Sequence, residues 1–240
     1  MRTDDLFLSQ AVLCVDPRGA PRGMDVTYLL HQGIASLFGQ YERRPYLYRV
    51  DGQSDIAYVA LILSTGQPSV PLVRTAGVMF SELATKPFDI RVAPGTLLDY
   101  EIRLNATKDV VQGVGSNATK RRTDVWEAVW GIDRNTPRTQ HEVYGGYLRR
   151  RLAGVATVRT AQVTERGLLL ATRPGRGRKP ITVVATNVIG TLEVTDTNAL
   201  VAAVRRGLGR AKAFGCGLLC LSRPGTVLPR RHAAASDRAF

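Results

Sequence analysis

Three histidines are the natural acid–base candidates in this chain of 240 residues, and His31 has the most suitable neighbour. Tyr28 precedes His31 by three residues, a spacing that places the two side chains beside each other on a helix. An imidazole with a pKa of ~6.5 can take or give a proton near neutral pH, and a tyrosine hydroxyl can orient or protonate a reacting group. The pair therefore suits acid–base chemistry, although its spacing also fits a partly exposed structural histidine. His141, beside Glu142 in polar sequence, and His232, in the tail, are predicted to have no catalytic role.

A glycine-rich segment near the C-terminus could bind a phosphate. Glycines let the backbone approach a ligand closely, and two cations within the segment supply positive charge. The segment lacks the Gly-Lys-Ser/Thr ending of a Walker loop, and it does not follow a strand and open a helix as a dinucleotide fingerprint does. A tight helix-to-strand connection is the alternative interpretation. The residues concerned are Gly207, Gly209, Arg210, Lys212, Gly215 and Gly217.

Three further groups of polar and basic side chains could contact nucleic acid. Each group alone is also typical of a solvated surface. The chain, however, has 33 Lys and Arg against 20 Asp and Glu, a formal net charge of +13, and such an excess favours contact with phosphates. The groups are Arg103, Asn105 and Lys108; Lys120, Arg121 and Arg122; and Arg176, Arg178 and Lys179 in a glycine-rich link over 173–180.

Composition excludes several classes of protein. With 44% hydrophobic and 22% charged residues, the chain is predicted to be globular rather than disordered. No apolar run approaches the ~18 residues that a membrane helix needs. Asp4 and Asp5 stand where a signal peptide would be basic, so we expect a cytoplasmic protein. The three cysteines are predicted to be reduced and structural, since Cys216 and Cys220 have no further ligands nearby to complete a zinc site.

The Tyr28–His31 pair requires a helix, and the apolar spacing over residues 26–38 predicts one, with Asp25 as its N-cap. The other elements predicted for the first half are strands over 6–15, 46–50, 56–64 and 88–92, and a weaker helix within 70–84. Ala93-Pro94-Gly95 then interrupts the pattern.

After residue 95 a similar order of elements begins again. The predicted strands cover 97–104, 155–164, 167–172, 181–194 and 214–221, and the helices cover 124–130, a stretch ending before 152, and 196–207. We therefore predict an α+β protein of two tandem ferredoxin-like (RRM-like) domains, 1–95 and 96–224, followed by a flexible tail, 225–240. Neither half contains the aromatic motif with which RRM domains stack bases, so stacking on the sheets is not expected.

The sequence resembles the CasE-type CRISPR RNA endoribonucleases, the repeat-processing subunit of the type I-E Cascade complex. Four blocks carry the resemblance, in order and spacing, over roughly residues 5–224: Tyr28-Leu29-Leu30-His31, Arg103-x-Asn105-x-x-Lys108, Lys120 to Arg122 with Trp126 and Trp130 behind them, and Gly207 through Leu221. The last block is the most specific. Ala106 stands where the family usually has Pro, and His31 lacks the Lys that follows it in some members.

This resemblance implies an enzyme that cuts the CRISPR repeat hairpin without a metal or another cofactor. It also implies that the product crRNA stays bound, together with other Cascade subunits. By resemblance His31 is the catalytic histidine and Tyr28 its partner, and the basic and glycine-rich segments contact RNA. One base would take the proton of a ribose 2′-hydroxyl, which attacks the phosphate, while an acid protonates the departing 5′-oxygen. Lys212, Arg210 or Arg103 would stabilise the phosphate charge.

Two other functions remain open at this point. A non-catalytic RNA-binding protein would have the same fold and charge. A small-molecule enzyme or assembly subunit would instead bind a nucleotide on the glycine-rich segment.

Overall fold

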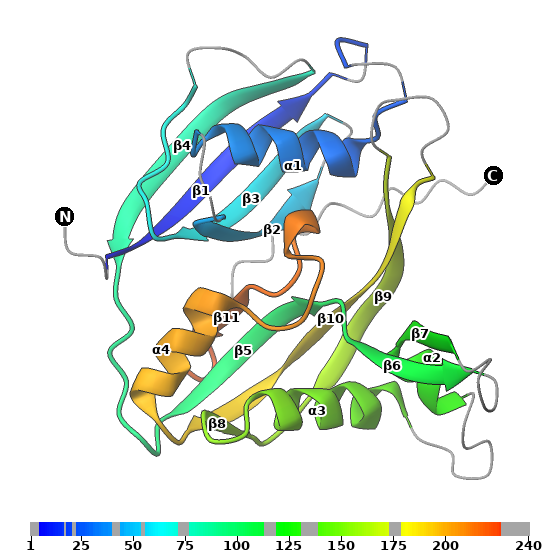
Figure 1. Ribbon diagram of the computed structural model, residues 1–240. Helices are drawn as coiled ribbons and strands as arrows, with labels where there is room; N and C mark the ends of the chain where they lie inside the picture. Colours follow the sequence, from blue (N-terminus) through cyan, green and yellow to red (C-terminus); the bar gives the residue numbers. More distant parts are fainter. Residues whose placement is uncertain are drawn as a thin grey trace.

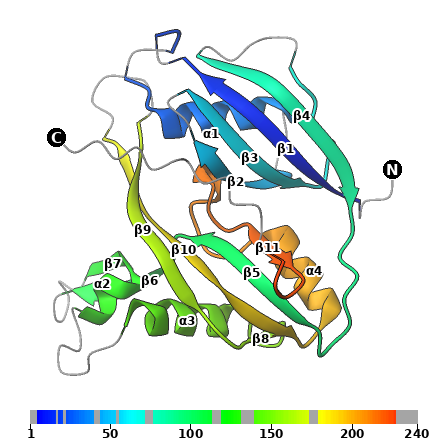
Figure 2. The ribbon, with the colours of Figure 1, turned by 180° about the vertical axis from the view of Figure 1, so that it is seen from behind.

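The computed structural model describes residues 5–16, 18–20, 23–39, 44–53, 56–71, 77–112, 119–130, 139–172 and 179–226. Each half of the chain forms an antiparallel sheet, and the helices lie on the same side of both sheets (Figure 1, Figure 2). A separate two-stranded sheet extends from the second half. Within these ranges no helix is long and apolar enough to cross a membrane.

The first half builds a four-stranded sheet in the order β2-β3-β1-β4. Its strands are β1 (Leu6–Val15), β2 (Tyr46–Gln53), β3 (Ala57–Ser64) and β4 (Val78–Phe88). Helix α1 (Val26–Ser36) covers one face, with Leu29 and Ile34 buried (Figure 1). Asp25 caps this helix, because its carboxylate accepts a hydrogen bond from the Tyr28 backbone nitrogen at 2.9 Å. The predictions of the first strand, the helix and the hairpin are confirmed.

The prediction of a helix within 70–84 and a strand over 88–92 is wrong. Residues 78–88 form the edge strand β4, which pairs with β1 along its length. Only Val78 of this strand is buried, so β4 lacks the alternation of apolar residues that marks a half-buried strand in a sequence. Pairing with β1 determines its conformation instead. The described residues of the first half contain no second helix.

The second half repeats this strand arrangement in the order β11-β5-β10-β8, and β9 also pairs with β10. Buried side chains of β5, β10, α3 and α4 form its core, including Tyr100, Leu148 and Leu200. A Thr139–Glu142 capping box begins α3. The elements are β5 (Leu97–Leu104), β6 (Thr107–Gln112), β7 (Thr119–Asp124), α2 (Val125–Trp130), α3 (Gln140–Arg151), β8 (Ala156–Val158), β9 (Gln162–Ala171), β10 (Ile181–Val194), α4 (Thr197–Arg206), the 3₁₀ turn η2 (Lys212–Phe214) and β11 (Leu219–Ser222).

The second half departs from the prediction in three places. The predicted strand 155–164 is divided between β8 and β9. The cations at 120–122 precede helix α2 as expected, but they lie in strand β7 of a β6–β7 hairpin that the sequence did not predict. The predicted strand 214–221 begins only at Leu219, because η2 and two left-handed glycines precede it. The α+β class and the two tandem ferredoxin-like units are nevertheless confirmed.

The two halves pack directly against each other. Leu6 and Leu47 of the first sheet belong to the core cluster of the second half. A largely buried ion pair also joins the sheets, with Arg49 Nη1 3.1 Å from Glu101 Oε2. The boundary predicted at residue 95 falls between β4 and β5 and stays a prediction, and residues 227–240 of the predicted tail lie outside the described ranges.

Candidate active site

His31 lies between two aromatic rings that come from different halves of the chain. The Tyr28 ring, one turn earlier on α1, has its centroid 5.9 Å from that of His31 at an interplanar angle of 65°. Phe214 of η2 meets His31 at the same distance, 5.9 Å, and at 66°. The predicted Tyr28–His31 pairing is therefore present in the structure. Phe214 was not singled out in the sequence, where it lies 183 positions from His31.

A hydrogen bond holds the start of α1 to the residue that follows β9. The second carboxylate oxygen of Asp25 accepts a hydrogen bond from the Thr172 backbone nitrogen. Thr172 is the residue before segment 173–178, and Figure 1 shows β9 and β10 reaching this end of the helix. Lys179 is exposed just after the segment, whereas Arg176 and Arg178 lie outside the described residues.

The glycine-rich segment closes on itself and on the end of β5. The Leu208 nitrogen donates to the Gly217 oxygen at 2.9 Å, and the Gly217 nitrogen donates to the Arg103 oxygen at 2.7 Å. Gly217 has φ 91°, and a Cβ there would lie 2.6 Å from the Leu208 oxygen. At Gly207 a Cβ would lie 2.7 Å from Leu47 Cδ1. These closest approaches are to protein atoms, and contact of the four glycines with RNA stays a prediction.

Two buried polar side chains hold this segment in place. The Tyr48 hydroxyl donates to the Ala213 oxygen at 2.6 Å, next to Phe214. Burial raises the pKa of Tyr48 strongly, so the hydroxyl keeps the proton that it donates. The Asn105 side-chain amide donates to the Val184 oxygen at 2.8 Å, and its backbone oxygen accepts from the Arg210 nitrogen at 3.4 Å. Asn105, predicted to contact RNA, is thus buried beneath the segment.

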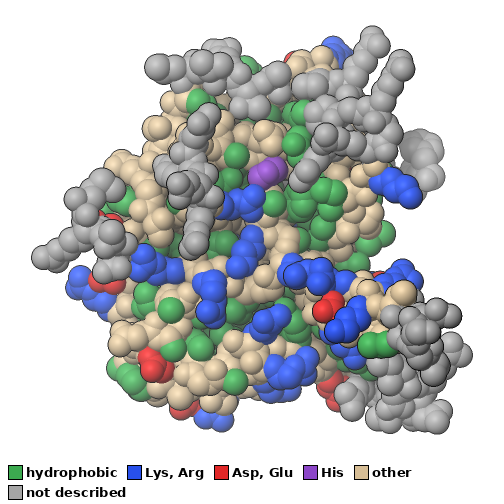
Figure 3. Space-filling model, in the orientation of Figure 1, with side chains coloured by type: hydrophobic (Ala, Val, Ile, Leu, Met, Phe, Trp, Pro, Cys, Tyr) green, Lys and Arg blue, Asp and Glu red, His purple; other side chains and the backbone are tan. Residues whose placement is uncertain are grey.

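Cations surround the segment on the face that carries the helices. Lys212 Nζ donates to the Arg206 oxygen at the end of α4, at 2.6 Å. Partial burial, and then the charges of Arg206 and Arg151, lower the pKa of Lys212. Arg210 is exposed, and Arg103 is half-buried. Figure 3 shows Lys and Arg side chains gathered in a band below a histidine, over the ends of α4 and α3. The sequence had predicted neither Arg206 nor Arg151 as part of this group.

The remaining predicted cations lie away from His31, on the β6–β7 hairpin (Figure 1). Lys120 and Arg121 are exposed on β7, and Arg122 is also exposed but pairs with Asp109, with Nε and Oδ1 3.1 Å apart. Lys108 is half-buried on β6. The structure therefore divides the predicted cations between the surroundings of His31 and this second location.

No site for a metal ion is apparent from the side chains that the structure describes, since they form no group of three or more His, Cys, Asp or Glu residues suited to one. Cys14, Cys216 and Cys220 form no disulfide. Burial raises the pKa of the Cys216 thiol to about 11. His141, predicted to lie at the surface without a catalytic role, accepts a hydrogen bond at Nδ1 from the Val163 nitrogen at 3.0 Å.

Known proteins match the chain over most of its length. Among curated proteins, the Cascade subunit CasE of the Escherichia coli K12 CRISPR system is 25% identical over 198 residues, which is 81% of this chain and 91% of CasE. Crystallographic Cas6e from E. coli K-12 aligns with a TM-score of 0.64 and 23% identity, covering 90% of this chain and 99% of Cas6e. Thermus thermophilus Cse3, solved with an RNA representing a pre-cleavage complex, aligns with a TM-score of 0.63 and 22% identity. This alignment covers 91% of this chain and 99% of Cse3.

These structural matches establish the fold, and the family follows from the sequence. The model of the family described as CRISPR associated protein matches residues 6–223, which include α1 with Tyr28 and His31 and the whole glycine-rich segment. This span agrees with the range over which the four sequence blocks resemble CasE-type proteins. The chain therefore belongs to the CRISPR associated protein family, and its resemblance to the CasE type is confirmed.

Proposed function

We propose that this chain is a metal-independent endoribonuclease that cuts CRISPR precursor RNA at the repeat hairpin. The observation that carries the proposal is the placement of His31 between Tyr28 and Phe214, the last residue of the 3₁₀ turn η2 that begins with Lys212. An imidazole beside phosphate-binding cations is suited to moving protons during RNA cleavage. The relatives support this assignment, since one is a Cascade subunit and others were solved with RNA.

The proposed reaction needs only an acid, a base and a stabilising cation. A base takes the proton of the ribose 2′-hydroxyl, and this oxygen attacks the adjacent phosphorus in line. The bond to the 5′-oxygen breaks, and an acid protonates that oxygen, which leaves a cyclic phosphate and a 5′-hydroxyl. His31 serves as one of these two groups, and Tyr28 orients the nucleophile or completes the pair.

Stabilisation of the phosphate charge falls to nearby cations. The Lys212 ammonium donates one hydrogen bond to the Arg206 oxygen, and it has three N–H donors, so two remain for phosphate oxygens. Arg210 and Arg103 are the other candidates in the same segment and at its anchor on β5.

After cleavage the protein is proposed to stay bound to the 3′ hairpin of the crRNA as a subunit of Cascade. The basic link 173–180 and the cations of the band would hold the RNA backbone. The cytoplasmic location and the domain limits 1–95, 96–224 and 225–240 also stay predictions. Co-purification with crRNA and with the other Cascade subunits would test the assembly.

A single modified RNA tests the chemistry. If the ribose hydroxyl is the nucleophile, a repeat RNA with one 2′-deoxy substitution immediately 5′ of the cut binds normally and stays intact. The unmodified RNA is cut in excess EDTA, because no proposed step uses a metal ion. Cleavage of the deoxy RNA, or loss of activity on chelation, would rule out this mechanism. Binding of the hairpin with no cleavage under any condition would favour a non-catalytic RNA-binding protein.

A further inference from the structure

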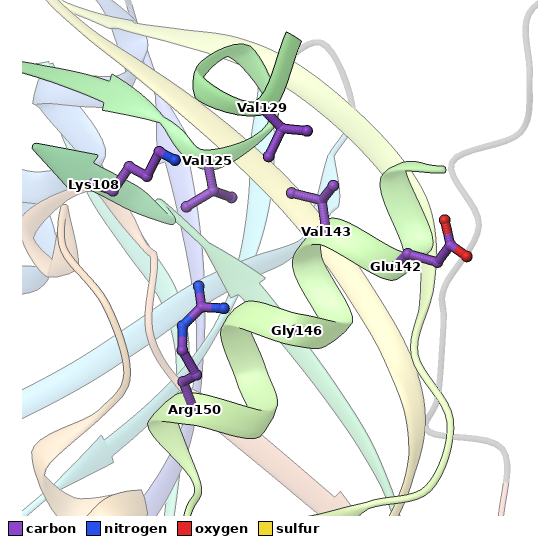
Figure 4. A pocket seen from close by; sticks show the side chains of 7 residues that line it. All are labelled: Lys108, Val125, Val129, Glu142, Val143, Gly146 and Arg150. Atoms are coloured by element: carbon purple, nitrogen blue, oxygen red, sulfur yellow. The ribbon is translucent and has the colours of Figure 1, made fainter. Parts of the chain in front are cut away.

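A pocket of about 180 Å³ opens between β6, α2 and α3, away from His31 (Figure 4). Val125 and Val129 of α2 and Val143 of α3 form its apolar walls. Lys108 of β6 and Arg150 of α3 complete the lining, and Figure 4 shows their charged ends pointing into the same space. The pocket thus combines an apolar surface with two converging cations.

Among the described residues, no carboxylate neutralises these two cations. In the ranges that the structure describes, no ion pair involves Lys108 or Arg150. Glu142 lines the pocket, but its carboxylate accepts hydrogen bonds from the Thr139 nitrogen at 2.7 Å and hydroxyl at 3.2 Å, and it points away in Figure 4. Because two like charges that face one space repel each other, an anion bound between them would be stabilised.

Gly146 keeps the pocket open. A glycine inside a helix is less stable than alanine, so a mid-helix glycine calls for a packing or functional reason. Its neighbour Gly145 has a packing reason, because a Cβ there would lie 3.1 Å from Ala161 Cβ. At Gly146 the nearest atom to an added Cβ would be Arg150 Nη1, at an ordinary 3.8 Å. Packing therefore does not demand Gly146, whereas a side chain at this position would enter the pocket.

We propose that this pocket binds one unpaired nucleotide of the RNA on which the chain acts. The phosphate would lie between Lys108 and Arg150, and the base or ribose against the valines at Gly146. Charge on the same side of the protein favours RNA as the occupant, because the band of cations in Figure 3 extends over α3 and the paired strand β7 exposes Lys120 and Arg121. A base can enter a pocket of this kind only when it is unpaired and unstacked.

The inference rests on the proposed function only in taking RNA as the ligand, and its test measures binding rather than cleavage. All variants carry His31→Ala so that the RNA stays intact. Two RNAs are compared: the repeat hairpin alone, and the same hairpin with unpaired nucleotides on both sides. Arg150→Gln is expected to lower the affinity for the flanked RNA roughly ten-fold and the affinity for the bare hairpin less than about two-fold. The reason is that the substitution removes one charged donor that would bond the phosphate of the unpaired nucleotide. Arg149→Gln, which removes an exposed neighbouring charge outside the pocket lining, is the matched control.

Filling the pocket gives a second and independent readout. Gly146→Leu adds a good helix former beside three valines, so the melting temperature should rise while the affinity for the flanked RNA falls roughly ten-fold. Opposite changes in stability and affinity separate a blocked pocket from a damaged fold. If the melting temperature of Gly146→Leu is lower than that of the His31→Ala parent, the comparison of Arg150→Gln with Arg149→Gln alone tests the inference.

Three results would overturn the inference. If Arg150→Gln lowers the affinity for both RNAs equally, Arg150 contacts the paired stem. If its losses of affinity are no larger than those of Arg149→Gln, the pocket does not bind RNA. Unchanged RNA affinity with failed assembly of Cascade would identify an acidic side chain of a partner protein as the occupant. Failure of the proposed function has a different signature, since the parent chain with His31 intact would then bind the hairpin without cutting it.

Discussion

His31 is the side chain on which the proposed cleavage depends most. His31→Ala is expected to lower the single-turnover cleavage rate by ~10²- to 10⁴-fold, the usual contribution of a positioned acid or base. Affinity for the hairpin should stay within a few-fold, because the imidazole acts mainly in the transition state. Tyr28→Phe keeps the ring beside His31 and removes only the hydroxyl, so a smaller loss of rate is expected. Full activity of His31→Ala would remove this residue from the mechanism.

Single residues also show how far the sequence could predict the site. Tyr28 and His31 could be paired in advance because a helix brings residues three apart together regardless of the rest of the fold. Phe214 could not, because its contact with His31 depends on how a loop of the second half packs against the first. Asn105 was predicted to contact RNA from its place in the polar segment with Arg103 and Lys108, and this contact stays a prediction. The sequence did not indicate that its side-chain amide donates to the Val184 oxygen.

Among the elements, η2 connects the second half to helix α1. Tyr48 of β2 donates to the Ala213 oxygen at 2.6 Å, and Phe214 follows directly and contacts His31. Tyr48→Phe removes this donor and leaves the partly buried Ala213 carbonyl without it, at a cost of about 1 kcal/mol. Because η2 would then be held less firmly, the cleavage rate should fall by roughly ten-fold while hairpin affinity stays within about two-fold. Single-turnover kinetics and equilibrium binding measure the two effects.

A control and a double variant separate positioning from general damage. Tyr46→Phe alters another buried tyrosine of β2, whose ring stacks on that of Phe38 with the centroids 4.5 Å apart. This control should leave the cleavage rate unchanged. If Tyr48 acts through Phe214, adding Tyr48→Phe to Phe214→Leu should lower the rate no further than Phe214→Leu alone. If the loss of rate in the double variant equals the product of the losses in the two single variants, this coupling is contradicted.

The elements that the sequence missed are those with few buried apolar residues. The edge strand β4 and the exposed strand β7 are held by backbone pairing with β1 and β6, and pairing leaves no periodic pattern in a single sequence. Helices α1 and α4 were predicted because an N-cap and an apolar stripe mark each of them locally.

At the scale of the whole molecule, the positive charges differ in whether an acidic side chain pairs with them. A band of cations lies on the face with the helices (Figure 3), while other cations are neutralised locally, as in the pair of Arg91 Nε with Asp89 Oδ2 at 2.7 Å. Unpaired cations release condensed counterions when they bind RNA, whereas paired cations contribute less. The net charge of +13 was evident from composition, but its distribution depends on the fold.

The basic link 173–180 provides the test at this scale. Replacing Arg176, Arg178 and Lys179 with Gln should weaken hairpin binding and flatten its salt dependence, since each lost phosphate contact lowers the slope of log affinity against log salt by ~0.7 to 0.9. Affinities measured across a salt series give the slope. The control is a triple variant in which Gln replaces three exposed cations of other segments, Lys86, Arg91 and Arg159. It changes the net charge by the same amount. A larger loss of slope in the first triple places the link on the RNA backbone, because net charge alone would act equally in both. Equal slopes in the two triples would make the link an ordinary solvated hairpin tip.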